Sequence, residues 1–413
     1  MFTSSASGMV GLRKTIWSSA IIQSRKKSLK KFVQIFLLIS FASGLASNSN
    51  AHQFTWDIIF GGDTNPIFLD DSFETSVEAY NQSRFEFSHD AKDGGIYYTL
   101  KGDGSQFADN DEPLANSLNG DKILAKAALG WDWRPEFDYG EGQIKIELNY
   151  DHFDNVFVDR TTGRLARFNG VEVSDRFDYS APGFLISTVI PLSEEADFIL
   201  EIDGNDRSYE DYNLPGLANL DFQEVEIDLG FEKLIWPRTL VRTMIGAGKR
   251  IYVDRRGRAD DGTIIADSEL EFSYLEVENS IDFAITNRWH WITGFDIDQR
   301  KDSEGGYYDV TEGEFFTRIR YLNNEYVDFY FDVSYFKREY DNTDYNDFFV
   351  FEDEQKEREG YGLRAELVRN IIGRGWDRMD LIIGISADSF ENEDPVYTYD
   401  RGQAYVGIRW RPY

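Results

Sequence analysis

The sequence predicts an all-β protein, folded as a transmembrane antiparallel up-and-down β-barrel of about 16 strands. Three observations lead to this fold class. Segments with a hydrophobic period of two recur throughout residues 52–413, the connections between them are alternately short and long, and an apolar segment typical of an export signal precedes them. Aromatic residues, which favour pleated surfaces, make up 15% of the chain.

The alternation is clearest in QIKIELNY, where Ile144 and Ile146 alternate with Lys145 and Glu147. The stretches EVEIDLGFE, GEFFTRIRY, DFYFDVSY, YGLRAEL and DLIIGISAD repeat this pattern. Such strands present one apolar and one charged face, and several reach the roughly 9 to 11 residues that cross a bilayer when a strand is tilted. Beyond residue 51 no run of about 18 apolar residues occurs, so no spanning helix is predicted there.

Sixteen segments of this kind can be placed. They are residues 53–61, 80–90, 94–104, 121–134, 141–153, 174–191, 196–204, 221–236, 238–253, 269–284, 288–300, 311–322, 326–339, 359–371, 378–389 and 402–411. The first two are weakly patterned, so residues 52–80 have an alternative interpretation as a lead-in or plug. Because single-chain bacterial barrels close with an even number of strands, the predicted range is 14 to 18.

The connections fall into two classes. The short ones are 135–142, 191–196, 235–239, 285–288, 322–326 and 372–378, and the long ones are 154–172, 204–220, 254–268, 300–310, 340–358 and 392–400. This order is that of a barrel with short periplasmic turns and longer external loops. A water-soluble β-sandwich also alternates, but its loops are of similar length at both ends, so it is the weaker alternative.

The tryptophans predict which rim of the barrel faces the periplasm. Seven lie beside a short turn or close to the end of the sequence: Trp131, Trp133, Trp236, Trp289, Trp291, Trp376 and Trp410. Trp56 lies near the start of the first strand, and no tryptophan lies in a long loop. Aromatic rings of transmembrane barrels gather at the membrane interfaces, so these seven predict a periplasmic aromatic rim.

Residues 1–51 are predicted to be an export signal with a long basic n-region. SRKKSLKK is followed by the apolar FVQIFLLISFASGLA and by small residues that allow cleavage after Ala46 or Ala51. A transmembrane anchor is the alternative, although the apolar run is shorter than the roughly 20 residues that a span needs. Residues 52–413 are then a single barrel domain.

Charge and composition exclude several functions. The net charge is −31, and residues 1–51 carry seven basic and no acidic residues, so residues 52–413 carry 36 basic against 74 acidic residues, a net charge of −38. Such a surface repels phosphates, so nucleic acid is not an expected partner. The absence of cysteine excludes a disulfide, a thiolate metal site and a thiol nucleophile.

The architecture and the closing segment YDRGQAYVGIRW resemble the outer-membrane β-barrel porins of Gram-negative bacteria, including porin-like families found with exopolysaccharide genes. The resemblance covers most of residues 53–413 and carries no catalytic motif. It implies an outer-membrane location, contact with the bilayer and lipopolysaccharide, and insertion by the barrel assembly machinery, which recognises a terminal aromatic. Here RPY follows Trp410, so either Trp410 is that aromatic or Pro412 breaks the strand.

The predicted function is passive diffusion of small hydrophilic solutes, with a preference for cations because acids outnumber bases. A barrel of this size is too wide for side chains to fill, so the inward residues should line water. The predicted pore-lining residues are Lys145, Glu147, Glu224, Glu226, Asp228, Asp296, Asp298, Arg318, Arg320, Asp328, Asp332, Arg364, Glu366, Asp388 and Arg409. The alternative for any one of them is a salt bridge that stabilises the wall.

Two other functions stay open. A barrel that exports polysaccharide or assembles the outer membrane fits the long loops rich in tyrosine and acids, such as residues 338–354. An outer-membrane hydrolase is less favoured, with His152 in NYDHFDN as its one candidate base. No cofactor is expected and no metal site is predicted, because DNTDYND lacks the glycine and terminal Glu of a calcium loop.

Overall fold

The computed structural model describes residues 52–65, 77–90, 94–107, 122–156, 158–159, 164–323, 326–341, 358–372, 377–392 and 398–412. The chain divides into Met1–Ala51 and His52–Tyr413. The predicted export signal lies outside the described residues, and everything below concerns the second unit. Among the described residues, no helix has the length and apolar character needed to span a bilayer.

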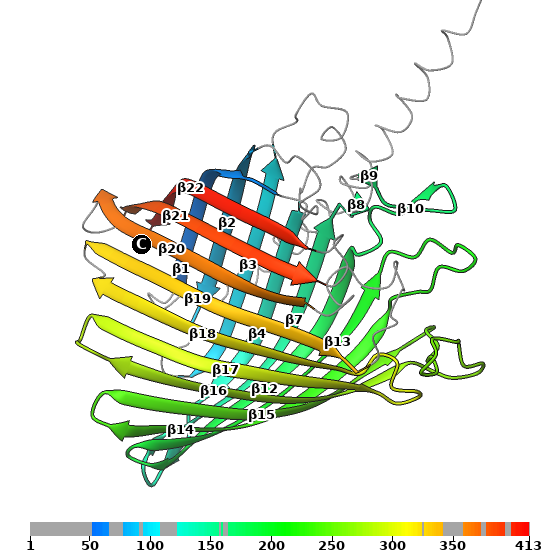
Figure 1. Ribbon diagram of the computed structural model, residues 1–413. Coiled ribbons are helices and arrows are strands. Elements are labelled where there is room, and N and C mark those ends of the chain that lie inside the picture. The colour runs from blue at the N-terminus through cyan, green and yellow to red at the C-terminus, as the bar shows by residue number, and fades with distance from the viewer. Residues whose placement is uncertain are drawn as a thin grey trace, which may run out of the picture. The chain divides into compact units, whose positions relative to one another are not determined.

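Sixteen strands hydrogen-bond in chain order into one closed antiparallel barrel (Figure 1). They are β1 (His52–Asp63), β2 (Glu78–His89), β3 (Gly95–Phe107), β4 (Lys122–Trp133), β7 (Gln143–Asn155), β12 (Tyr179–Ser193), β13 (Ala196–Tyr209), β14 (Phe222–Trp236), β15 (Thr239–Tyr252), β16 (Glu271–Ala284), β17 (Trp289–Asp302), β18 (Val310–Asn323), β19 (Val327–Tyr340), β20 (Arg358–Ile372), β21 (Asp377–Asn392) and β22 (Tyr399–Pro412). The predicted fold class and the number of strands are confirmed.

The described parts of the connections contain three small hairpins. They are β5–β6 (Glu136–Phe137 and Gly140–Glu141), β8–β9 (Val158–Asp159 and Arg164–Leu165) and β10–β11 (Arg167–Phe168 and Val171–Glu172). None of them joins the barrel sheet.

Two predictions about strand positions need correction. The alternative of a lead-in or plug over residues 52–80 is wrong for His52–Asp63, which is a full barrel strand. The strand predicted from residue 174 begins only at Tyr179, because the preceding residues turn: the N–H of Arg176 donates to the carbonyl of Val173 (3.2 Å), and the N–H of Asp178 to that of Asp175 (3.0 Å).

The barrel closes where β1 pairs with β22, as the pattern of the last strand predicts. Trp56 lies opposite Trp410 at one end of this seam, and Asp63 lies opposite Gln403 at the other. The last strand continues through Pro412, which pairs with Asp377, so Pro412 does not break it. Closure leaves no unpaired strand edge, which a bilayer would not tolerate.

Short and long connections emerge at opposite ends of the barrel (Figure 1). Residues 194–195 and 237–238 form tight turns at one end, whereas residues 210–221 and 253–270 form long loops at the other. We call these the turn end and the loop end. Short turns and long loops therefore alternate along the chain, as the sequence predicts.

The apolar face of each strand points outward. On β14, Val225, Ile227 and Leu229 are 45–51% exposed, whereas the intervening Glu226 and Asp228 are only partly exposed. Side chains diverge on the convex face of a barrel and converge on the concave face, so the more exposed apolar row is the outer one. Exposed apolar rows recur on most strands, and only a surrounding apolar solvent accounts for so much of them.

Candidate functional site

The lumen face of β13 to β18 carries a row of carboxylates that we call the acidic wall. It consists of Glu201, Asp203, Glu226, Asp228, Glu276, Glu278, Asp296, Asp298 and Glu314. The register places acids directly opposite one another: Asp203 faces Glu226, Glu276 faces Asp298, and Asp296 faces Glu314. Neighbouring strands lie about 4.8 Å apart, so these charges repel one another across the sheet.

Glycines on β15 allow the acidic wall to be continuous. A Cβ atom at Gly246 would lie 2.3 Å from Oδ1 of Asp228 and 3.3 Å from Cβ of Glu276. Carboxylates from β14 and β16 therefore approach each other across β15, in space that any larger residue would fill. Gly248, opposite Glu226, leaves the next inward position equally open.

Cations touch only the margin of the acidic wall. Arg250 pairs with Glu224 (2.8 Å), and Arg338 pairs with Glu312, both near the loop end. Within the described part of the chain, no arginine or lysine forms an ion pair with any of the nine acids of the wall. The nine carboxylates thus lack direct ion pairs among the described residues, although Arg250, Arg300 and Arg338 act electrostatically on Asp298.

The lumen face from β18 through β22 to β3 differs, because most of its charges are paired; we call it the ion-paired wall. Its ion pairs join Arg409 to Asp57 (2.8 Å), Arg401 to Asp63 (2.6 Å), Arg364 to Glu366 (2.8 Å), Arg84 to Asp103 (3.1 Å) and Arg318 to Asp332. Two of these pairs, those of Arg409 and Arg401, cross the seam between β22 and β1. Bidentate contact of Arg409 with Asp57 fixes the geometry further.

All fifteen residues predicted to line the pore lie on this inward, polar face of their strands. Nine of them fall into two groups. Glu226, Asp228, Asp296 and Asp298 belong to the acidic wall, whereas Arg318, Asp332, Arg364, Glu366 and Arg409 are engaged in ion pairs. The remaining six are Lys145, Glu147, Glu224, Arg320, Asp328 and Asp388.

Sequence reasoning missed five members of the acidic wall: Glu201, Asp203, Glu276, Glu278 and Glu314. The signal was present, since Glu276 and Glu278 alternate with Leu275 and Val277 within a predicted strand. It also missed a ring of aromatic side chains inside the barrel, because an aromatic residue at the end of a strand suggests the outer membrane interface.

We call this ring the inner aromatic girdle. From β7 to β16 the innermost residues at the loop end are Phe153, Tyr179, Tyr209, Phe222, Tyr252 and Phe272, and successive ring centroids lie 5.5, 5.6, 6.2, 5.4 and 5.6 Å apart. Guanidinium groups stack on these rings. Arg207 lies 4.4 Å from the ring of Tyr179, and Arg250 lies 4.4 Å from that of Phe222.

The tryptophans among the described residues lie at the turn end. Trp131, Trp133 and Trp236 are 55–66% exposed on the outward face, and Trp289 and Trp291 are 39% and 46% exposed. The indole N–H of Trp291 donates to Oγ1 of Thr317 (2.8 Å), so its polar atom is satisfied within the wall. Trp410 packs 6.5 Å from Trp56, whereas Trp376 lies outside the described residues.

His152, the candidate base, lies on the outward face near the loop end. Its Nδ1 is 3.3 Å from Oγ of Ser180, and the hydroxyl of Tyr150 donates to the same oxygen (3.0 Å). Ser180 therefore already has a donor. His152 and Ser180 are direct register partners between β7 and β12, where the sheet ladder uses the backbone amides that an oxyanion would need.

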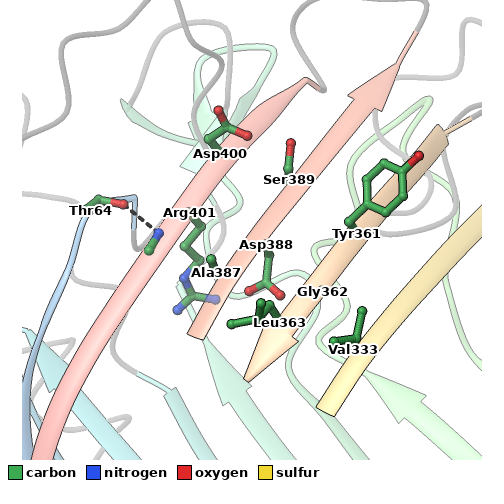
Figure 2. A pocket seen from close by; sticks show the side chains of 11 residues that line it. Thr64, Val333, Tyr361, Gly362, Leu363, Ala387, Asp388, Ser389, Asp400 and Arg401 are labelled. Atoms are coloured by element: carbon green, nitrogen blue, oxygen red, sulfur yellow. Dashed lines mark hydrogen bonds between the residues drawn. The ribbon is translucent and has the colours of Figure 1, made fainter. Parts of the chain in front are cut away.

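A groove of about 450 Å³ lies near the loop end of β19 to β22 (Figure 2). Val333, Tyr361, Leu363, Ala387 and Ser389 are among the residues that line it. At its edge, the N–H of Gly402 donates to Oγ1 of Thr64 (2.7 Å). These residues lie mostly on the outward face, so the groove belongs to the lipid-facing surface and not to the lumen. In the described residues no group of His, Asp or Glu has the geometry of a metal site.

The closed barrel, the even number of antiparallel strands, the outward apolar band and the alternation of turns and loops define the class of this protein. It is a transmembrane β-barrel of the outer-membrane type.

No protein-family profile matches this sequence, and no curated protein matches it. Several solved structures of barrels are similar. A bacterial polysaccharide outer membrane secretin has 9% identity and a TM-score of 0.42 over 87% of this chain and 97% of that chain. OccAB2 of Acinetobacter baumannii has 8% identity and a TM-score of 0.42, again over 87% and 97%. OccK2 (OpdF) of Pseudomonas aeruginosa has 8% identity and a TM-score of 0.39 over 87% and 97%. Likeness at this level does not identify a solute.

Proposed function

We propose that the protein is a passive outer-membrane channel for small hydrophilic solutes and that it prefers cations. The observation that carries this proposal is the acidic wall, with nine inward carboxylates on five strands. Side chains cannot fill a barrel of sixteen strands, so the lumen has room for water. Uncompensated charge of one sign raises the local concentration of cations and lowers that of anions.

Nine of the fifteen residues predicted to line the pore take two roles in this proposal. Those of the acidic wall face permeating ions, whereas those of the ion-paired wall present nearly balanced charge on the opposite side. A field then runs across the lumen from one wall to the other, and it orients polar solutes as they pass.

Reversal potentials test the cation preference. The full-length protein is inserted into a planar bilayer that separates a tenfold gradient of KCl, and we expect a reversal potential of the sign given by K⁺ permeation. The preference should weaken as salt rises, because the screening length falls from about 10 Å at 0.1 M to about 3 Å at 1 M. An absence of conductance, or a preference for chloride, would refute the proposal.

Export of polysaccharide remains the second candidate, and the inner aromatic girdle favours it, because sugar rings stack on aromatic faces. The acidic wall restricts this candidate to neutral or cationic polymers. Liposome swelling with graded uncharged sugars separates the two functions: a channel for small solutes shows a sharp upper limit in size, whereas an export barrel admits oligosaccharides.

A hydrolase is the least supported candidate. His152 and Ser180 are in contact, but the wall geometry offers the serine no free amide donors. Loss of a lipid-cleaving activity in a His152→Ala variant, with the barrel intact, would revive it.

We also propose the partners and processing that the class implies. The outward apolar band contacts the bilayer and lipopolysaccharide, the barrel assembly machinery inserts the chain, and residues 1–51 direct export. The seven tryptophans of the predicted rim then mark the periplasmic interface. N-terminal sequencing of the membrane-bound protein tests the processing, since cleavage after Ala46 or Ala51 is expected.

A further inference from the structure

Two loops at the loop end fold onto the lumen side of the barrel wall. They are residues 253–270, between β15 and β16, and residues 303–309, between β17 and β18. Tyr308 is 2% exposed, and its ring centroid lies 5.8 Å from that of Phe272 in the inner aromatic girdle. Phe272 shares the inward face of β16 with Glu276. A residue packed on Phe272 therefore lies inside the barrel mouth.

Tyr308 joins the two loops. Nε of Arg258, in the longer loop, donates to the hydroxyl of Tyr308 (3.1 Å). The guanidinium of Arg255 lies 5.4 Å from the ring of Tyr308 and 5.0 Å from that of Tyr252. Arg255 thus bridges the shorter loop and the girdle. We call Tyr308, Arg255 and Arg258 the tyrosine latch.

The loop backbones also touch directly. A Cβ atom at Gly305 would lie 2.3 Å from the carbonyl oxygen of Arg258, and one at Gly257 would lie 2.8 Å from Cβ of Glu304. Glycine at position 305 lets two backbones approach closely, as no larger residue could. Leu270, the last residue of the longer loop, is fully buried in one apolar cluster with Tyr307 and Tyr308 of the shorter loop. The two loops form one packed unit.

The side chain of Asp302 stabilises the conformation of the shorter loop. Its carboxylate accepts hydrogen bonds from the N–H groups of Glu304 (2.7 Å), Gly305 (3.2 Å) and Tyr308 (3.3 Å). This turn aims Tyr308 toward the girdle, and it begins directly at the end of β17. Asp298, of the acidic wall, lies on the same face four residues earlier, or roughly 13 Å along the strand.

We propose that the tyrosine latch holds both loops across the outer mouth above the acidic wall and thereby sets the largest solute that the channel admits. The inference rests on the proposed channel function. Within it, the acidic wall selects by charge, and the latch selects by size at a different level of the lumen.

Substitutions that release the latch test this inference. Tyr308→Ala removes the shared ring, and Arg258→Ala removes the donor to its hydroxyl. In liposomes swollen with graded uncharged sugars, the swelling rate is measured relative to that with the smallest sugar. For sugars just above the wild-type size limit, this relative rate should be severalfold higher in both variants than in the wild type. Tyr139→Ala and Arg256→Ala are matched controls, because both residues are exposed and neither belongs to the latch; they should keep the wild-type limit.

A reversible cross-link distinguishes release of the latch from a general loss of folding as the cause of a wider size limit. The chain contains no cysteine, so Gly257→Cys with Glu304→Cys gives a unique pair. A Cβ atom at position 257 would start 2.8 Å from that of residue 304, so the two loops must separate slightly to reach the roughly 3.8 Å that is usual for a disulfide. In the Tyr308→Ala background, oxidation should restore the wild-type size limit, and reduction of the same preparation should widen it again.

The outcomes are distinct. A permeable wild type with the same size limit in the latch variants, and in both redox states, would overturn the latch and leave the channel standing. A wild-type protein that admits neither ions nor sugars would overturn the channel and the latch together.

Discussion

The acidic wall and the ion-paired wall are built from the same alternating strands but treat charge in opposite ways. At the seam, Asp63 and Asp57 are almost fully buried and each accepts hydrogen bonds from an arginine of β22. Across β13 to β18, acids face acids. Repulsion between like charges opposes folding, so the acidic wall is maintained at a cost in stability. Compensated charge serves closure, and uncompensated charge is available to solutes.

The largest expected effect comes from breaking the seam. Asp63→Ala leaves Arg401 and Gln403 without their shared acceptor in a site where Asp63 is fully buried. Removing one partner of a buried ion pair costs about 3–5 kcal/mol, because the other charge stays desolvated. Urea unfolding of the barrel in lipid vesicles measures this loss.

Glu278→Gln is the matched control in the acidic wall. Because it relieves repulsion from Asp296, its register partner, we expect unchanged or slightly higher stability. Equal losses in both variants would mean that the two walls do not differ in how they use charge.

The strands and the direction of their side chains were predictable, because side chains along each strand of a closed sheet alternate between lipid and lumen. Once Val225, Ile227 and Leu229 face lipid, Glu224, Glu226 and Asp228 must face inward, and no tertiary information is needed. The same holds for every strand with a clear period of two. The weakly patterned β1 illustrates the limit: Gly61 and Gly62 interrupt its alternation, and only pairing with both β2 and β22 shows that it belongs to the barrel.

The identity of charge partners was not predictable, because it depends on register and on which strands become neighbours. Arg409 and Asp57 are 352 positions apart in the sequence, and closure alone brings them together. The inner aromatic girdle could not be predicted from the sequence for a different reason. Tyr252 is the last residue of β15 and Phe272 lies at the start of β16. At either position an aromatic residue equally suits the lipid interface, and only the parity of the strand decides whether it faces lipid or the lumen.

Acidification should tighten the packing around Asp178, in the loop between β7 and β12 at the loop end. Asp178 lies in the turn before β12, and burial, followed by repulsion from Asp154, raises its pKa to about 9; Asp175 and Glu210 add to the repulsion. Its Oδ1 accepts the N–H of Asn155 (2.8 Å). The packed loops therefore hold Asp178 protonated, whereas opened loops release the proton above a pH of about 4.

The higher pKa of Asp178 in the packed loops determines how their stability depends on pH. Packing is most stable below about pH 4 and weakens as pH rises toward 9, by at most about 1.4 kcal/mol per pH unit. Hydrogen exchange of the loop amides at pH 5 and pH 8, corrected for intrinsic rates, should show stronger protection at pH 5. Asp178→Asn retains the acceptor and should abolish the dependence; the same dependence in that variant would assign it to other groups.

The smallest expected effect is that of a single charge on selectivity, and it distinguishes the walls most directly. An ion in water about 8 Å from a carboxylate gains about 0.5 kcal/mol, roughly a twofold change in occupancy. Glu278→Gln should therefore lower the ratio of K⁺ to Cl⁻ permeability by about twofold at 0.1 M salt, as measured by reversal potential, and by less at 1 M. Arg318→Gln combined with Asp332→Asn removes two charges from the ion-paired wall but leaves its net charge unchanged. That variant should keep the wild-type ratio, because a permeating ion responds to uncompensated charge; a shift as large as that of Glu278→Gln would place selectivity in the ion-paired wall instead.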